Sequence, residues 1–333
     1  MARRKPPQIH GLLVIDKPAG ITSHDVVDRV RRRLGERRVG HAGTLDPDAT
    51  GVLLVGVGMA TRLVRFMDFV NVDGHMVSQK SYIGDVVLGT ETSTLDASGD
   101  VVATHDMNSV ITRLGESGGV DFVQSVIDAH FVGLIDQVPP MVSAIRVDGK
   151  RLHELAREGI EVEREARSVT VSRFVVTAIS GNVISIDVTC SSGTFIRTLA
   201  ADLGRALGGG AHLRNLRRTS VGAFTIADAA GIDDAPLRSV ATAVRGLSTL
   251  VVSGEEAESM RGLAATGKVL PIDRFSATGP EPWAVVAGDD VLAIYEAFSN
   301  AKVGEGMARP VVSLTSTSTS TSTSTSTSAS TNP

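Results

Sequence analysis

The hydrophobic pattern divides the chain into a long first part that mixes strands with helices and a short, β-rich second part. In the first part, apolar runs, or apolar residues alternating with polar ones, predict strands at 11–15, 52–57, 80–88, 169–176 and 183–188. The last two strands flank Gly181-Asn182, which predicts a hairpin turn. With the helices below, they predict an α+β (mixed α/β) domain with a central mixed β-sheet over residues 10–245.

Apolar residues at helical spacing predict helices between these strands. Thr22 stands three residues before Asp25, the spacing of a capping box, and Gly35 is a natural stop, so the first helix lies between them. Further helices are predicted at 108–114, at 195–207, and over a short segment with Leu152, Leu155 and Ala156 on its apolar side, ended by Gly159.

The second part begins after a boundary near residues 230–255. Short strands at 285–286, 291–295 and 311–314 predict a small β-rich module over 250–314. Residues 315–328 are a strict Thr-Ser repeat with no apolar residue to bury, which predicts a disordered tail over 315–333. At the other end, we expect residues 1–9 to be a basic, flexible N-terminus.

The composition is that of a soluble globular protein, with 42% hydrophobic and 21% charged residues among 333. No apolar run reaches the ~18 residues needed to span a bilayer, and the stretch after the N-terminus is too short for a signal peptide. We therefore expect a cytoplasmic protein without membrane contact. Cys190 is the only cysteine, which excludes an internal disulfide and a multi-Cys zinc site. The histidines are scattered, and none pairs with another at helical ligand spacing, so we expect no metal.

The net charge of −4 does not suggest RNA binding, but the charge is unevenly distributed. Residues 1–40 hold ten Lys/Arg against four Asp/Glu. Because local positive stripes neutralise phosphates, the sequence predicts contacts to an RNA backbone from Arg29, Arg32, Arg33, Arg214, Arg217 and Arg218. A solvated helix face is the plain alternative for each run.

The most informative segment is the loop at 40–51 (GHAGTLDPDATG), which places Asp46 among Gly, Pro and Thr residues before a buried strand. Such a loop can fix one side chain in place, although Asp46 could also only cap a turn. Two other motifs carry no chemistry. Gly56 and Gly58 lack the third glycine of a dinucleotide loop, and Ser23-His24-Asp25 are adjacent at a helix start and cannot converge as a triad.

Five ordered blocks resemble the TruB family, the tRNA pseudouridine-55 synthases, over most of residues 10–225. They lie at 14–23 (VIDKPAGITS), 40–51, 80–99 (KSY, then LGTETSTLDASG), 137–159 (QVPPMVSA, then GKRLHELAREG) and 190–218 (CSSGTFIR, then LRR). The resemblance implies the pseudouridine synthase fold. It also implies an isomerase that detaches a uracil of tRNA from its ribose, rotates it and rejoins it through carbon 5, without a cofactor.

The resemblance also implies residue roles. Asp46 would be the nucleophile, Arg197 the cation that keeps its pKa low, and Tyr82 the ring that stacks on the flipped base and can help to remove the carbon-5 proton. Whether Asp46 attacks the ribose anomeric carbon, attacks carbon 6 of the base or assists elimination stays open. Without the resemblance, core packing is the plainer interpretation of Tyr82. The implied substrate-binding positions are Lys17 (on a phosphate or on the catalytic loop), His41, Gly43, Thr44, Leu45, Lys80, Phe195 and Leu216.

Two segments depart from the family pattern. Position 195 is Phe where many relatives have Tyr, and residues 71–79 match poorly. The module at 250–314 resembles a reduced PUA domain, the RNA-binding appendage of the family. The implied partner is the T-arm stem-loop of tRNA, bound by a monomer. The alternatives are an RNA-binding chaperone that has kept the fold and a related synthase acting on rRNA or mRNA.

Overall fold

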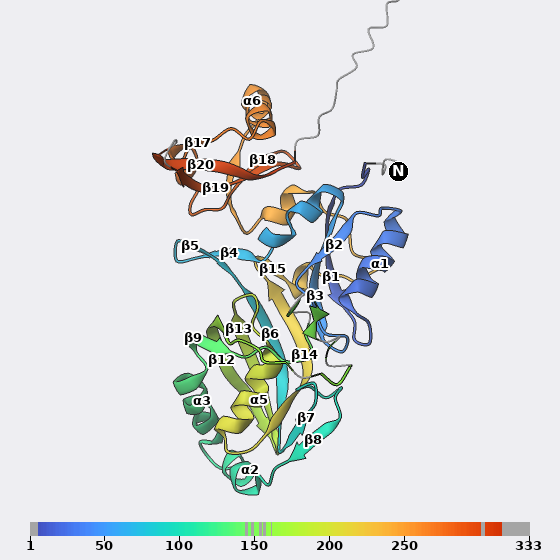
Figure 1. Ribbon diagram of the computed structural model, residues 1–333, viewed down its shortest axis with the longest axis vertical. Helices are drawn as coiled ribbons and strands as arrows, with labels where there is room; N and C mark the ends of the chain where they lie inside the picture. The colour runs from blue at the N-terminus through green and yellow to red at the C-terminus, as the bar shows by residue number, and fades with distance from the viewer. Residues whose placement is uncertain are drawn as a thin grey trace, which may run out of the picture.

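The computed structural model describes residues 6–143, 146–147, 150–152, 155, 158–160, 162–300 and 304–314. The molecule is elongated, with a long sheet through its larger part and a smaller β-rich part at one end (Figure 1). The predicted tail at 315–333 and the first five residues lie outside the described ranges. None of the helices within these ranges is long and apolar enough to cross a membrane.

The larger part is built on a nine-stranded sheet with the main order β1-β3-β14-β6-β13-β12-β9. Its strands are β1 (Gly11–Lys17), β2 (Val39–Ala42), β3 (Thr50–Val57), β6 (Lys80–Leu88), β9 (Gly133–Gln137), β12 (Arg167–Ser180), β13 (Val183–Cys190), β14 (Ala211–Val221) and β15 (Phe224–Thr225). Because β14 runs parallel to β3 and antiparallel to β6, the sheet is mixed, and the predicted α+β fold is confirmed. The predicted hairpin of β12 and β13 is confirmed as well.

The helices of this part are α1 (Ser23–Leu34), α2 (Asn108–Leu114), α3 (Gly119–His130) and α5 (Ile196–Ala206). The side chains of Thr22 and Asp25 form the predicted capping box at the start of α1, and Gly35 ends the helix in the left-handed conformation. α3 was not predicted. Of the short helix expected before Gly159, Leu152 and Leu155 are buried, and other positions lie outside the described residues.

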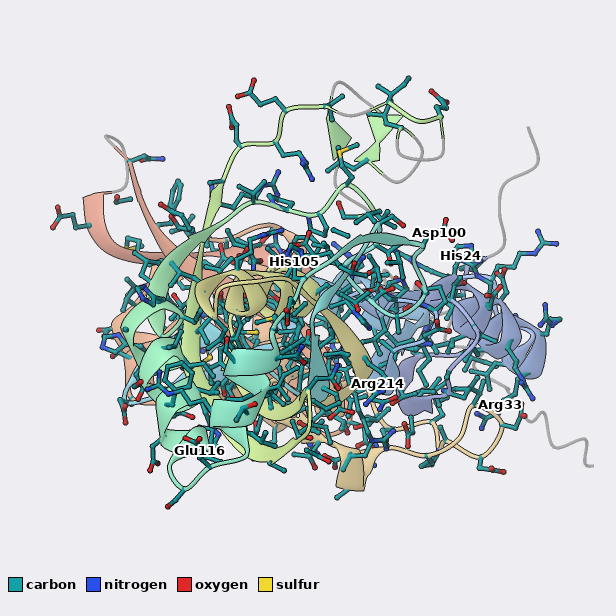
Figure 2. The ribbon with its side chains drawn as sticks, turned by 90° about the horizontal axis from the view of Figure 1, so that it is seen from below. His24, Arg33, Asp100, His105, Glu116 and Arg214 are labelled. Atoms are coloured by element: carbon teal, nitrogen blue, oxygen red, sulfur yellow. The ribbon has the colours of Figure 1, made fainter. Side chains whose placement is uncertain are left out.

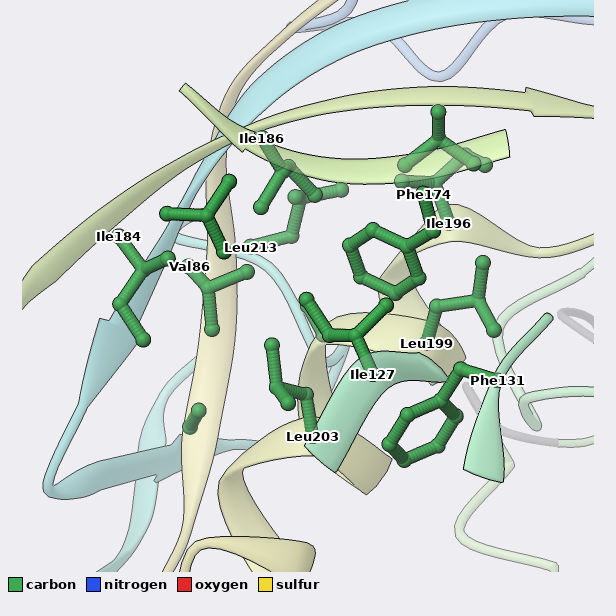
Figure 3. Close-up of a cluster of buried hydrophobic side chains, with 14 of the residues drawn as sticks. Val86, Ile127, Phe131, Phe174, Ile184, Ile186, Ile196, Leu199, Leu203 and Leu213 are labelled. Carbon is green, nitrogen blue, oxygen red and sulfur yellow. The ribbon is translucent and has the colours of Figure 1, made fainter. Parts of the chain in front are cut away.

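The main core lies between the sheet and the pair α3 and α5 (Figure 3). Phe174 of β12, Ile127 of α3 and Leu199 of α5 are at most 1% exposed and belong to one buried cluster. This packing fixes α5 against the sheet, and with it the residue at the first turn of α5, Arg197.

Smaller elements connect the sheet strands. The poorly matching segment at 71–79 falls largely within a hairpin of β4 (Phe69–Val72) and β5 (His75–Ser78) that leads directly into β6. The other small elements are β7 (Thr90–Thr92), β8 (Val101–Thr104), β10 (Arg146–Val147), β11 (Lys150–Arg151) and the 3-10 turns η1 (Gly58–Arg62), η2 (Val64–Phe66), η3 (Ile226–Asp228) and η4 (Ala241–Val244).

The smaller part contains a five-stranded sheet of order β16-β18-β19-β20-β17. Its elements are β16 (Ser248–Val251), α6 (Gly254–Ala265), β17 (Leu270–Pro271), α7 (Asp273–Ser276), β18 (Trp283–Ala287), β19 (Asp290–Asn300) and β20 (Gly304–Ser313). The three predicted strands are confirmed, while α6 was not predicted. Val286 and Ile294 belong to the same buried cluster as Leu12 and Val14 of β1, so the two parts share a hydrophobic core.

Candidate active site

The loop between β2 and β3 that carries Asp46 is held from beneath by a buried lysine. Lys17, at the end of β1, is 0% exposed. Its Nζ donates to the carbonyl oxygens of Pro18 (2.9 Å), Ile21 (2.7 Å) and Pro47 (2.8 Å). All three ammonium protons are therefore used within the protein. Buried and with its three protons donated, Lys17 has none left for a phosphate, and its contacts hold the loop of Asp46.

Burial lowers the pKa of Lys17 to about 8, although nearby carboxylates, Asp48 first, oppose this effect. A second contact fixes the same loop, because the Oγ of Ser23 accepts from the Leu45 amide at 2.9 Å. Leu45 and Ala49 are each 4% exposed and anchor the loop in the core. The loop that carries Asp46 is therefore held by Lys17 at Pro47 and by Ser23 at Leu45.

Asp46 forms an ion pair with Arg197 that uses both carboxylate oxygens. The distances are 3.0 Å from Nε to Oδ2 and 3.2 Å from Nη2 to Oδ1. Arg197 is 4% exposed, and it also donates to the carbonyl oxygens of Thr94 (2.8 Å) and Val142 (2.9 Å). The planar guanidinium is therefore fixed on three sides, and it orients Asp46 in turn.

A second carboxylate, Asp96, lies 3.6 Å from Nε of Arg197 and was not singled out from the sequence. Asp96 accepts from the Thr94 hydroxyl (2.7 Å) and the Ser98 amide (3.0 Å), so its own loop positions it. Asp96 lies within the family-like block at 80–99, which was the available signal.

The pKa of Asp46 is raised, not lowered as expected. Burial is the largest cause, and Asp96 adds to it by like-charge repulsion, while Arg197 and Lys17 oppose it. The prediction of a lowered pKa took only the charge of Arg197 into account. In the folded protein the cost of partly burying the carboxylate, whose side chain is still 39% exposed, outweighs the attraction of Arg197.

Asp46 and Arg197 face a cavity of about 360 Å³. Predicted site residues from distant parts of the chain meet in its wall: Gly43, Thr44, Leu45, Asp46, Lys80, Tyr82, Phe195, Arg197, Leu216 and Arg218. Ser143, Gly193, Thr194 and Ile196 complete the lining. A cavity of this size has room for one pyrimidine ring.

Asp46 also lines a smaller cavity of about 150 Å³. Asp46, Arg197 and Leu216 line both cavities. Leu216 follows Asn215, which has a positive φ of 56° at a register shift of β14 against β6, so a bulge directs Leu216 toward the site. His41, on β2, lines neither cavity. Its pKa is lowered, first by burial and then by the charge of Arg218.

Tyr82 and Lys80 form the wall of the larger cavity on β6. Tyr82 is 8% exposed, and burial raises the pKa of its hydroxyl. Nζ of Lys80 pairs with Asp68 at 3.1 Å and contacts the hydroxyl of Ser192, which also donates to Asp68. Burial lowers the pKa of Lys80, and Asp68 opposes this.

Three of the six arginines predicted to bind RNA phosphates are occupied by the protein itself. Arg218 is 1% exposed and donates to the carbonyl oxygens of Val52 (2.8 Å) and Gly43 (3.0 Å), so it is too buried to reach a phosphate. Arg217 makes two hydrogen bonds to Asp16, at 2.8 and 3.1 Å. Arg33 donates to two carbonyl oxygens of the chain, those of Ile232 and Ala235.

Arg33 is nevertheless exposed, and so are the other three predicted arginines. Arg29 pairs with Asp233, and Arg214 lies 3.8 Å from Asp85. Arg32 is exposed. Figure 2 shows Arg33 on the N-terminal part and Arg214 nearer the middle of the molecule. Among the residues that the structure describes, no group of three His, Cys, Asp or Glu side chains could hold a metal ion.

The fold resembles that of chains in two solved structures. One chain in a crystal structure of a Cbf5-Nop10-Gar1 complex matches with a TM-score of 0.61 and 23% identity, over 90% of this chain and 83% of that chain. A chain of an H/ACA RNP bound to a substrate RNA containing 2'-deoxyuridine matches with a TM-score of 0.59 and 22% identity, over 92% and 85% of the two chains.

Sequence relatives define the family. The tRNA pseudouridine synthase B of Corynebacterium aurimucosum is 46% identical over 77% of this chain and 84% of its own length, and that of Rhodococcus jostii is 50% identical over 65% and 67%. The N-terminal domain of the TruB family pseudouridylate synthases matches residues 31–196, and the C-terminal domain of tRNA pseudouridylate synthase B matches 197–240. The chain belongs to the TruB family of pseudouridylate synthases and is an isomerase, which confirms the resemblance found in the sequence.

Proposed function

We propose that this enzyme converts uridine-55 in the T-arm loop of tRNA to pseudouridine. The observation that carries the proposal is the ion pair of Asp46 with Arg197 at the wall of a cavity large enough for one uracil. The named relatives, which are tRNA pseudouridine synthases, support tRNA as the substrate. A protein that only binds RNA would gain nothing from a carboxylate that is half-buried at the wall of a cavity and oriented there by an arginine.

Asp46 acts as the nucleophile in this proposal. Its two hydrogen bonds to Arg197 aim the carboxylate, and the raised pKa makes the ionised form more basic than an exposed Asp would be. The reaction is a rearrangement in which the glycosidic bond to N1 breaks and a bond from carbon 5 replaces it. Attack at the anomeric carbon, attack at carbon 6 and assisted elimination all fit this position of Asp46.

The target uridine must leave its stack to reach Asp46. Tyr82 stacks on the flipped base in the proposal, and its hydroxyl takes part in removing the carbon-5 proton. Gly43, Thr44, Leu45, Lys80, Phe195 and Leu216 complete the uracil site, since all of them line the cavity. His41 acts from the second layer, next to the loop of Asp46.

RNA binding outside the cavity is divided between two regions. Residues 10–245 form the catalytic domain, on which Arg29, Arg32 and Arg214 are exposed enough to approach phosphates. Residues 250–314 form a PUA-like module that binds tRNA away from the T-loop. The protein acts as a monomer in the cytoplasm and needs no cofactor.

The test uses purified protein and unmodified RNA, with pseudouridine mapped at single-nucleotide resolution. We expect one modified position in a tRNA transcript, uridine-55, and comparable modification of an isolated T-arm stem-loop. The same uridine inside a continuous duplex should react far more slowly, because unpairing adds a few kcal/mol to flipping. Equal rates on loop and duplex would contradict the closed site, and modification only of rRNA or mRNA fragments would contradict the substrate.

A further inference from the structure

Arg218 is a buried cation without a carboxylate partner. The other two cations in the wall of the larger cavity are neutralised, since Lys80 pairs with Asp68 at 3.1 Å and Arg197 pairs with Asp46 at 3.0 Å. In the part of the chain that the structure describes, no carboxylate lies within ion-pair distance of Arg218. It donates to the carbonyl oxygens of Val52, Thr44 and Gly43 and also contacts the hydroxyl of Tyr82.

A full positive charge that is 1% exposed and unpaired is costly, so it calls for an explanation. Holding the catalytic loop does not require a charge, because a neutral donor can also bind carbonyl oxygens. The loop already has a dedicated cation in Lys17. The charge itself is therefore the feature to be explained.

The charge of Arg218 is directed at the cavity. Arg218 lies opposite Tyr82 in the register of β14 and β6, and both line the cavity. At Gly43, a Cβ atom would come within 3.3 Å of Nη1 of Arg218 and of Nζ of Lys80, so the two cations converge on one point of the wall. A side chain at position 43, where φ is +78°, would strain the backbone and press on both cations. After burial, the field of Arg218 is one of the causes that lower the pKa of Lys80.

We propose that Arg218 stabilises the uracil ring as an anion while it is detached from the ribose. The inference rests on the proposed function. When the bond between C1' and N1 breaks, both electrons stay on N1 and spread over O2 and O4. The ribose is satisfied by a new bond to the Asp46 carboxylate or by loss of a proton from C2'. The anion then turns in the cavity, and the electron pair at carbon 5 forms the new bond to C1' while the bond to Asp46 breaks or C2' regains its proton. Carbon 5 then loses its proton and N1 takes one up, so the atoms of the product are those of the substrate. No oxidant or reductant is needed.

The part of the cavity wall formed by Arg218 must then favour a negative ring over a neutral one. A preorganised cation in a site that excludes water is suited to this, because it does not reorganise as the charge develops. The pair of Lys80 with Asp68 supplies donors at the same wall but no net charge. Arg218 alone adds the excess positive charge that the leaving ring needs.

The test uses 5-nitrouracil, a uracil that ionises near neutral pH and changes its absorbance when it does. We titrate the full-length protein with this probe across pH and follow the absorbance of the bound form. We expect the wild-type protein to bind the anion at least tenfold more tightly than the neutral form, which lowers the pKa of the bound probe by at least one. Arg218→Gln should abolish this preference, and Arg218→Lys, which keeps the charge, should retain most of it.

Arg217→Gln is the matched control, because Arg217 is the neighbouring arginine, pairs with Asp16 and does not line the cavity. It should leave the preference unchanged. Equal binding of both probe forms by the wild type, no binding at all, or an equal loss in Arg217→Gln would overturn the proposal. If Arg218→Gln fails to fold, the wild-type titration and Arg218→Lys still decide. The probe needs no turnover, so a failure here is distinct from absence of pseudouridine in tRNA, which would overturn the proposed function instead.

Discussion

Replacing the lysine beneath the catalytic loop tests how that loop is held. Lys17→Met keeps an unbranched apolar stem but removes the ammonium group that donates to Pro18, Ile21 and Pro47. The three carbonyl oxygens would then lack this donor in a site from which water is excluded, since Lys17 is 0% exposed. We expect the variant to be less stable and to lose activity, because Pro47 directly follows Asp46.

The magnitude follows from two opposing terms. A hydrogen bond from a charged donor is worth about 1.5–3 kcal/mol, so three of them contribute roughly 4–9 kcal/mol. Burial of the charge offsets part of this, because it lowers the pKa of Lys17 from 10.5 to about 8. That difference corresponds to about 3 kcal/mol, since a tenfold change in proton affinity is about 1.4 kcal/mol. The expected net loss at pH 7 is therefore about 1–6 kcal/mol.

The lowered pKa of Lys17 also makes the stability of the protein depend on pH. Between pH 8 and 10.5 the unfolded chain keeps a proton on Lys17 that the folded protein has lost, so the stability of the wild type rises with pH relative to the variant. Urea unfolding at pH 7 and pH 9.5 should therefore show a wider gap at the higher pH. Lys268→Met, at an exposed lysine, is the control and should show no such change. A Lys17→Met protein as stable as wild type, or a stability difference that narrows as the pH rises, would contradict this role of Lys17.

Three further predictions concern the site and the RNA. Asp46 must be ionised to react and its pKa is raised, so activity should be lost in acid at a pH above 3.8, the ordinary pKa of Asp. Asp96→Asn removes a like charge and should move this loss of activity to lower pH. A pH–rate profile that the substitution does not shift would count against the effect of Asp96 on Asp46. Tyr82→Phe keeps the ring and removes the hydroxyl, so single-turnover rates should drop severely while RNA affinity holds; full activity would leave stacking as the only role of Tyr82. RNA affinity measured by filter binding should fall with salt by about 0.7–0.9 in log K per phosphate contact and per tenfold rise, and a flat response would exclude Arg29, Arg32 and Arg214 as contacts.

Elements specified by local chemistry were predictable from the sequence. The strand at 80–88 and the helix at 108–114 have the predicted bounds, and Thr22 and Gly35 end the first helix as expected. In each case the signal lies within a few residues of the element. That Asp46, Arg197 and Leu216 line one cavity was expected only from the family motifs. Hydrophobic periodicity could not predict it, because the order of strands in the sheet brings these residues together.

The fate of individual charges was not predictable, because their partners are distant in the sequence. Arg33 donates a hydrogen bond to the carbonyl oxygen of Ile232, and Arg218 donates one to that of Val52. These partners lie at least 166 residues apart in the sequence and meet only in the folded protein. A basic run therefore looked like an RNA surface even where its guanidinium groups hold the protein together. The predicted direction of the Asp46 pKa shift was wrong for a related reason. The shift depends on burial and on Asp96, which the tertiary structure brings about and the loop sequence does not show. α3 and α6 were missed, although both bury an apolar side in the final structure.

A single-turnover assay of Asp46→Asn determines whether Asp46 performs the chemistry. The substitution keeps the shape of the side chain and removes its charge. Wild type and variant are incubated in excess over an unmodified tRNA transcript, pseudouridine is mapped at each uridine, and RNA binding is measured in parallel. We expect the wild type to modify uridine-55 and the variant to form no pseudouridine while binding RNA with similar affinity. Wild-type-like conversion by the variant would contradict the role of Asp46.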